Sequence, residues 1–255
     1  MNWDTTDRLS SGLAVNVPDQ ARLLSDLKTR LAQRQGFTIA TLNLDHTVKL
    51  RQDAAFLDAY GAHTHITADG NPIVWLSRLA GQSEIGLVPG SELIEPLSTL
   101  AAEQNVPIAL FGATDASLQA AADGLRKTCP GIDVALCLAP PMGFDPEGHQ
   151  AQDAIQAIKA SGAQIVFLAL GAPKQERFAR FAASALPEVG FVSIGAGLDF
   201  ISGDQVRAPR WVRAVAMEWV WRMFGNPRRL VGRYAACLAI LPRLTWRALR
   251  SRAGQ

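Results

Sequence analysis

Six short apolar runs within residues 37–197 constrain the fold of this chain more than any other feature. Apolar and β-branched residues dominate these runs, and segments with helical patterning separate most of them. Such alternation is typical of βαβ units, in which the strands run parallel. The runs are FTIATL (37–42), HIT (65–67), IALFGA (108–113), IDVALCL (132–138), QIVFLAL (164–170) and GFVSIGAG (190–197). We therefore predict an α/β fold built on a parallel sheet.

The helical segments have recognisable ends. We expect one helix that begins at Asp19 and ends before Gly36, a single helix over residues 45–60, and a helix that Gly81 ends. Residues before about Val17 are expected to be a loose lead-in. The apolar fraction of 48% supplies a full core without disulfides or a structural metal.

Charge divides the chain into two parts. Residues 203–255 contain 11 arginines, no lysine and two acidic residues, a net charge of +9, whereas the remaining residues carry −7. This change in composition predicts a boundary between a catalytic domain, residues 1–202, and a basic helical appendage, residues 203–255. The asymmetry favours an anionic partner for the appendage: a membrane surface, nucleic acid or a phosphorylated substrate.

Cysteine usage and the ends of the chain bear on location. Cys129, Cys137 and Cys237 form no C-x-x-C pair, which favours a reduced, cytoplasmic protein and argues against a structural zinc site. The first residues lack the pattern of a signal peptide. The late apolar run at 235–242 is far shorter than the roughly 20 residues that span a bilayer.

In a parallel sheet, ligands bind beyond the carboxyl ends of the strands, so the residues that follow each run are candidates. The FGATDAS segment places Gly112 before a helix start, where a phosphate is favoured, although Thr114 or Asp115 as a helix cap explains the pattern equally well. In GAPKQE, Lys174 suits an anion and Gln175 suits a diphosphate; a solvated helix start is the alternative.

Asp69 is the candidate general base. It follows a strand and precedes a Gly-Asn turn, and Thr41 and Asn43 are expected at a neighbouring strand end. A carboxylate in that position can accept a proton if its surroundings tune its pKa. The commoner alternative is an Asx-type turn cap.

Histidines and metal ligands contribute little. His46, His63, His65 and His149 are each expected to be surface or capping residues. The chain lacks the Asp-x-Asp pair that would hold a divalent cation against a nucleotide diphosphate. We therefore expect no metal and no other cofactor.

The segment at 208–230 is rich in tryptophan and arginine. Trp211 and Trp219 fall roughly on one helical face, with arginines beside it. The alternative is an ordinary terminal helix docked on the core, but a wide, Trp-rich apolar surface flanked by arginines favours a helix lying in a bilayer interface. Nucleic acid is not the expected partner, because no stacking platform or recognition module accompanies the charge.

Several motifs in these same loops resemble one family. They are TLNLDHTVKLRQDAAF, ITADGNPIVWLSRLAG, LFGAT, PPMGF, LGAPKQE, IGAGLDFISGDQVRAPRW and EWVWRMFGNPRRLVGRY, in order from about residue 37 to 235. The chain resembles the WecG/TagA/CpsF family of bacterial glycosyltransferases. The resemblance implies a Rossmann-like parallel sheet with helices on both faces and a C-terminal helical appendage that helps to bring the enzyme to the membrane.

The resemblance also implies an activity. Family members transfer N-acetylmannosamine or a related hexose from a UDP-sugar to a polyprenyl-diphosphate-linked saccharide, with inversion and without metal, in cell-surface polysaccharide biosynthesis. By the same resemblance, Asp69 and Thr41 are catalytic, Asn43 is Thr41's partner, Gln175 approaches the donor diphosphate, and Asp199 approaches the uridine. The appendage arginines implied for the acceptor and the membrane are Arg207, Arg222 and Arg229, and Trp211 and Trp219 of the Trp-rich face are expected to contact the membrane beside them. These expectations place the protein at the inner face of the cytoplasmic membrane.

The chain departs from the family pattern at one position. Many members carry arginine three residues before the glycine that is here Gly90, whereas this chain has Leu87. If that arginine contacts a phosphate in relatives, either another arginine does so here or the donor or acceptor differs.

Two other functional classes are weighed against this one. A Rossmann-like oxidoreductase requires a dinucleotide fingerprint after a strand, and the sequence contains none. A non-catalytic peripheral membrane scaffold of polysaccharide assembly would use the same basic appendage, and it would bind liposomes without releasing UDP from any donor.

Overall fold

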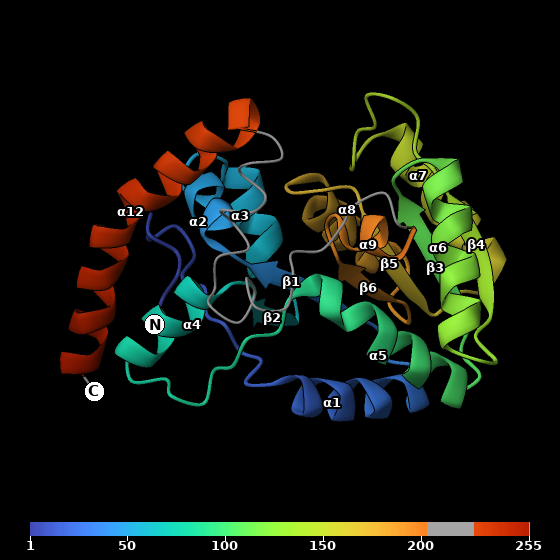
Figure 1. Cartoon of the computed structure of the whole chain (residues 1–255), viewed down its shortest axis with the longest axis horizontal. Coiled ribbons are helices and arrows are strands. Elements are labelled where there is room, and N and C mark those ends of the chain that lie inside the picture. The colour runs from blue at the N-terminus through green and yellow to red at the C-terminus, as the bar shows by residue number, and fades with distance from the viewer. Residues whose placement is uncertain (203–226, 255) are drawn as a thin grey trace.

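The six apolar runs form the six strands of one sheet, in which every pairing is parallel. The computed structural model describes residues 1–202 and 227–254 (Figure 1). The sheet order is β2-β1-β6-β5-β3-β4, and this arrangement confirms the predicted Rossmann-like α/β fold. The strands are β1 (Phe37–Leu42), β2 (His65–Ala68), β3 (Ile108–Gly112), β4 (Val134–Leu138), β5 (Ile165–Ala169) and β6 (Gly190–Ser193).

Helices cover both faces of the sheet, because alternate strand residues are apolar on each side. One face packs against α1 (Gln20–Ala32), α5 (Gly90–Glu103), α6 (Asp115–Thr128) and α9 (Gly197–Ser202). The other face packs against α3 (Ala54–Gly61), α7 (His149–Ser161) and α8 (Lys174–Ala185). Beyond β2, at one end of the molecule, lie α2 (Leu44–Leu50), α4 (Asn71–Leu79) and α12 (Pro227–Ala253) (Figure 1).

Two local expectations were wrong. The single helix predicted over residues 45–60 is two helices, because the carboxylate of Asp53 accepts a hydrogen bond from Phe56 N at 3.0 Å and starts α3 afresh. The first 17 residues are not a loose lead-in. Trp3 and Leu13 are buried, and the backbone nitrogens of Asn16 and Val17 both donate to Ile66 O at the edge of the sheet.

The C-terminal helix α12 is anchored to that N-terminal segment. Ile240, Leu244 and Ala248 are buried in the same apolar cluster as Trp3 and Leu13. The guanidinium of Arg243 donates to Thr5 O at 2.9 Å, and that of Arg247 donates to Asp4 O at 3.0 Å. One side of α12 therefore belongs to the core. The predicted boundary at residue 203 opens the segment 203–226, which lies outside the described residues.

The lengths and compositions of the helices bear on membrane crossing. Within residues 1–202 and 227–254, no helix is both long enough and apolar enough to cross a bilayer.

The ends of β3 and β5 approach each other closely at Gly112. A Cβ atom on this glycine would lie 2.5 Å from the carbonyl carbon and oxygen of Ala169, and its φ of +125° is one that side-chain-bearing residues rarely adopt. Ala113 N then donates to Ala169 O at 3.2 Å. Gly112 thus has a structural reason to be glycine, whatever ligand lies beyond it.

We predict that Gly112→Ala lowers the free energy of unfolding by more than Gly131→Ala does. Gly131 also has a positive φ, +86°, but a Cβ there would meet nothing within 4 Å. The control therefore carries the backbone strain alone, about 1–3 kcal/mol, whereas Gly112→Ala adds a backbone clash of about the same size. Urea denaturation of both variants measures the difference, and equal losses would show that the close approach to Ala169 has no energetic consequence.

Candidate active site

Polar residues predicted from separate loops gather at the carboxyl edge of the sheet. Thr41 is buried one residue before the end of β1, and Asp69 is half-buried directly after β2. Asp69 N donates to Leu42 O at 2.7 Å, which holds the candidate base beside the end of the neighbouring strand. The parallel pairing Thr41↔Thr67 sets this registration.

Helix α5, which the sequence analysis did not predict, packs its first turn onto these strand ends. A Cβ on Gly90 would lie 3.1 Å from Thr41 Cγ2 and 3.0 Å from Ser193 O. Just before α5, Val88 N donates to Ala68 O at 2.9 Å, and Thr67 Oγ1 donates to Val88 O at 2.8 Å. Leu87, the residue that departs from the family pattern, is 43% exposed and immediately precedes the hydrogen-bonded Val88.

Asn43 acts as the N-cap of α2. Its Oδ1 accepts a hydrogen bond from His46 N at 2.9 Å. The side-chain oxygen of this predicted substrate ligand is therefore already used in the fold, and only the amide nitrogen stays outside that cap bond.

Gln175 joins two of the predicted donor-binding loops. Its Oε1 accepts from Gly195 N at 3.1 Å in the loop after β6, and its Nε2 donates to Glu176 Oε1 at 2.8 Å. Gln175 is buried, whereas its neighbour Lys174, the first residue of α8, is partly exposed.

Glu176 is a component of the site that the sequence analysis missed. Its side chain is fully buried, and burial raises the pKa of its carboxyl to about 7. Oε1 accepts from Gln175, while Oε2 has no hydrogen-bond partner among the described residues. The motif GAPKQE was visible in the sequence, but nothing in it distinguishes a buried glutamate from a solvated one.

A second buried polar contact lies beside this carboxyl. His46 Nδ1 and the Tyr60 hydroxyl are 2.9 Å apart, and both residues are fully enclosed. Burial lowers the pKa of His46 to about 4. Burial first, and then the negative charges of Glu176 and Asp69, raise the pKa of Tyr60 well above its usual value. The charges of Glu176 and Asp69 thus both affect the pKa of Tyr60, and its hydroxyl stays neutral.

The expectation that the histidines are surface or capping residues was wrong for His46, which is buried and contacts Tyr60. His63 is also buried, but its Nδ1 donates to Ala59 O at 2.7 Å in the last turn of α3 and so caps that helix, and burial lowers its pKa to about 4. His65 is partly buried and contacts Asp26. His149 is exposed at the start of α7, as predicted.

Basic side chains meet at the same end of the molecule. Lys49 Nζ lies 2.9 Å from Asp45 Oδ2 and donates to Ala172 O at 3.3 Å in the loop before α8. Arg233 of α12 lies 3.8 Å from the other oxygen of Asp45. This pair of cations connects α2, the loop after β5 and α12, and it supplies positive charge near the strand-end edge.

The structure describes the remaining predicted site residues in part or not at all. For Asp199 in α9 and Arg229 in α12, the backbone alone is described. Arg207, Trp211, Trp219 and Arg222 lie outside the described residues. In the described part of the chain, His, Cys, Asp and Glu side chains form no group of three or more that could hold a metal ion.

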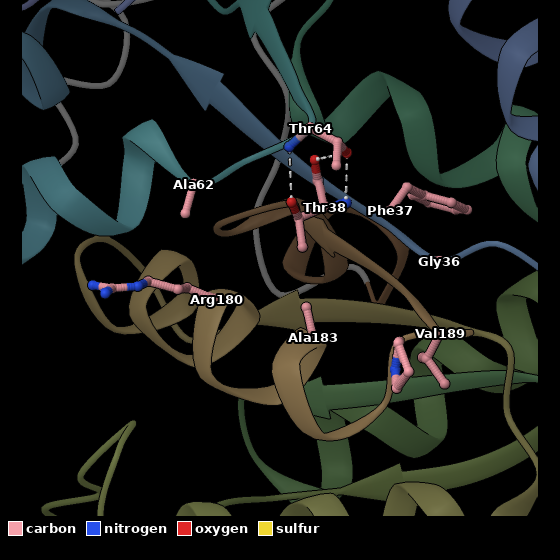
Figure 2. Close-up of a pocket in the computed structure, with 9 residues that line it drawn as sticks. Gly36, Phe37, Thr38, Ala62, Thr64, Arg180, Ala183 and Val189 are labelled. Atoms are coloured by element: carbon pink, nitrogen blue, oxygen red, sulfur yellow. Dashed lines mark hydrogen bonds between the residues drawn. The ribbon is translucent and has the colours of Figure 1, made fainter. Parts of the chain in front are cut away.

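A separate hollow of about 220 Å³ opens at the opposite edge of the sheet (Figure 2). It lies at the amino ends of β1 and β6, where Thr38 and Thr64 exchange hydrogen bonds and Arg180 extends along one side (Figure 2). Because the polar residues of the strand-end loops are absent from its lining, this hollow is distinct from the candidate site.

The sequence profile of the Glycosyl transferase WecG/TagA/CpsF family matches residues 9–255 of the chain. The match spans all six strands and the loops at their carboxyl edge, so it includes Thr41, Asp69 and Gln175. Coverage of nearly the whole chain agrees with the order of motifs along the sequence. The chain belongs to the WecG/TagA/CpsF family, and it is a glycosyltransferase of polysaccharide biosynthesis.

Proposed function

We propose that this glycosyltransferase moves N-acetylmannosamine or a related hexose from a UDP-sugar to a polyprenyl-diphosphate-linked saccharide, with inversion and without a metal. The observation that carries the proposal is the position of Asp69. Asp69 is half-buried directly after β2, its backbone nitrogen donates to Leu42 O at the end of β1, and the loops after β5 and β6 begin on the same edge of the sheet.

In this mechanism Asp69 takes the proton from the acceptor hydroxyl as that oxygen attacks the anomeric carbon. One base and stabilisation of the leaving group suffice for a single displacement. Thr41 and the amide nitrogen of Asn43 orient the sugar or the acceptor, and Asp199 approaches the uridine.

The leaving UDP requires positive charge and hydrogen-bond donors. An amide nitrogen carries two hydrogens, so the bond from Gln175 Nε2 to Glu176 leaves one for the diphosphate. Gly112 ends β3 and Lys174 begins α8 after β5, both on the same edge, and the cationic side chains of Lys49 and Arg233 lie close by. In this proposal these cations, with Arg207, Arg222 and Arg229 of the appendage, take the place that a divalent metal would have.

We further propose that α12 seats the enzyme on the inner face of the membrane. Its outward residues recur at spacings of three and four, so they form one apolar stripe away from the core: Val231, Ala235, Leu238, Pro242, Trp246 and Leu249. Trp75 of α4 is 58% exposed next to an apolar groove of about 260 Å³ that α4 and α12 form together. Exposed Arg243 and Arg250 lie beside the stripe. An apolar stripe with flanking arginines suits an anionic lipid surface, and Trp211 and Trp219 are proposed to bind the same surface.

Replacing the proposed base tests the chemistry. Asp69→Asn is expected to retain UDP-sugar binding and to lose turnover by about 10²–10⁴-fold, because the amide cannot accept the acceptor proton. Calorimetry measures donor binding, and a coupled assay of UDP release measures turnover. Asp58→Asn, at an exposed position on α3, is the matched control. Near-normal turnover of Asp69→Asn would remove Asp69 from this role.

A charge placed in the α12 stripe tests membrane docking. Leu238→Glu is expected to weaken binding to phosphatidylglycerol vesicles by about tenfold or more, because an apolar contact is lost and a like charge is added. Gln150→Glu, exposed on α7, adds the same charge outside the stripe and should have little effect. Vesicle co-sedimentation compares the two, and equal binding by both variants would contradict docking through this stripe.

A further inference from the structure

We propose that Glu176 is a positioning residue for the sugar-nucleotide donor, holding the amide of Gln175 in one orientation and thereby joining the loop after β5 to the loop after β6. The inference rests on the proposed UDP-sugar transferase function. It adds a residue that contacts neither sugar nor acceptor, and whose protonation tunes donor binding.

The hydrogen bonds run in one direction through three residues. Gly195 N donates to Gln175 Oε1 at 3.1 Å, and Gln175 Nε2 donates to Glu176 Oε1 at 2.8 Å. A glutamine amide can rotate to exchange its oxygen and nitrogen, but a backbone N–H on one side and a carboxyl oxygen on the other leave one favourable orientation. Without Glu176, the Gln175 nitrogen would lose the acceptor that defines its position.

Burial of Glu176 costs folding free energy, so a purely structural role does not explain its presence. The carboxyl is fully enclosed, and Oε2 has no hydrogen-bond partner among the described residues. A buried acid with an unsatisfied oxygen costs free energy that an apolar side chain of similar size would avoid. Its hydrogen bond with Gln175 gives the carboxyl a functional role, and that role accounts for a buried acid that destabilises the fold.

The charges around Glu176 are few. Lys49 on α2 is the cation that acts on it, and the carboxyl of Glu176 in turn raises the pKa of Tyr60 on α3, as does that of Asp69. Strands β1, β5 and β6 carry no ionisable side chain, and those of α7, which are His149, Asp153 and Lys159, are exposed. On α8 itself, Arg177 is paired with Glu147 and Lys174 is partly exposed.

This setting makes donor binding sensitive to pH. Burial raises the pKa of Glu176 to about 7, so the carboxyl is neutral on the acid side of this value and anionic above it. A diphosphate near Gln175 is itself anionic and favours the neutral form. Donor affinity should therefore be highest below pH 7 and fall as the pH rises through 7.

The test is equilibrium binding of UDP to the full chain and to two variants at pH 6 and pH 8. Glu176→Gln keeps an oxygen for Gln175 and cannot ionise, so it shows only the titration of UDP itself. The dissociation constant of the wild type, divided by that of Glu176→Gln, is expected to rise by about fivefold from pH 6 to pH 8, the effect over this range of a bound donor that raises the pKa of Glu176 by about one unit from about 7. Glu176→Ala, which removes the acceptor, is expected to bind UDP about tenfold more weakly than Glu176→Gln at both pH values.

Two results would overturn the inference while leaving the proposed function intact. One is a ratio between wild type and Glu176→Gln that does not change with pH. The other is UDP binding by Glu176→Ala as tight as that of Glu176→Gln. If Glu176→Ala does not fold, as circular dichroism would show, the pH ratio alone decides. A wild-type protein that binds no UDP at either pH would overturn the proposed donor along with the inference.

Discussion

The parallel pairing of β1 with both β2 and β6 is the constraint on which the candidate site depends. These strands are distant in sequence, yet their carboxyl ends share one edge of the sheet. The pairing of β1 with β2 brings Asp69 to the end of β1, and the pairing of β6 with β5 on its other side sets Gly195 opposite the start of α8. The first turn of α5 then packs closely on Thr41 at Gly90, where a Cβ would lie 3.1 Å from Thr41 Cγ2. The geometry of the candidate site is therefore a consequence of strand order.

Buried polar groups behind that edge connect the loops to one another. The contact between His46 and Tyr60 and the bonds from Gly195 through Gln175 to Glu176 enclose titratable groups without exposing them to solvent. Burial keeps His46 and Tyr60 neutral at physiological pH, whereas Glu176 changes charge near pH 7. Such groups destabilise a core unless they are hydrogen-bonded, and each of these side chains has at least one such contact.

The strands and the strand-end residues were predictable because their patterns are local. Apolar runs mark each strand, and a polar residue such as Asp69 directly after a run marks the ligand edge. The start of α5 was missed although apolar residues recur at helical spacing from Leu93, because Pro96 interrupts the pattern. Burial of His46 and Glu176 was not predictable, since it depends on helices that are distant in sequence and pack together only in the fold.

Acceptor-dependent release of UDP tests the central claim most directly. The full-length protein is incubated with each of a panel of UDP-sugars, with and without a polyprenyl-diphosphate-linked saccharide, and UDP is quantified. The account predicts release from N-acetylmannosamine or a related hexose donor, and only when the lipid-linked acceptor is present. No acceptor-dependent release with any UDP-sugar would contradict it.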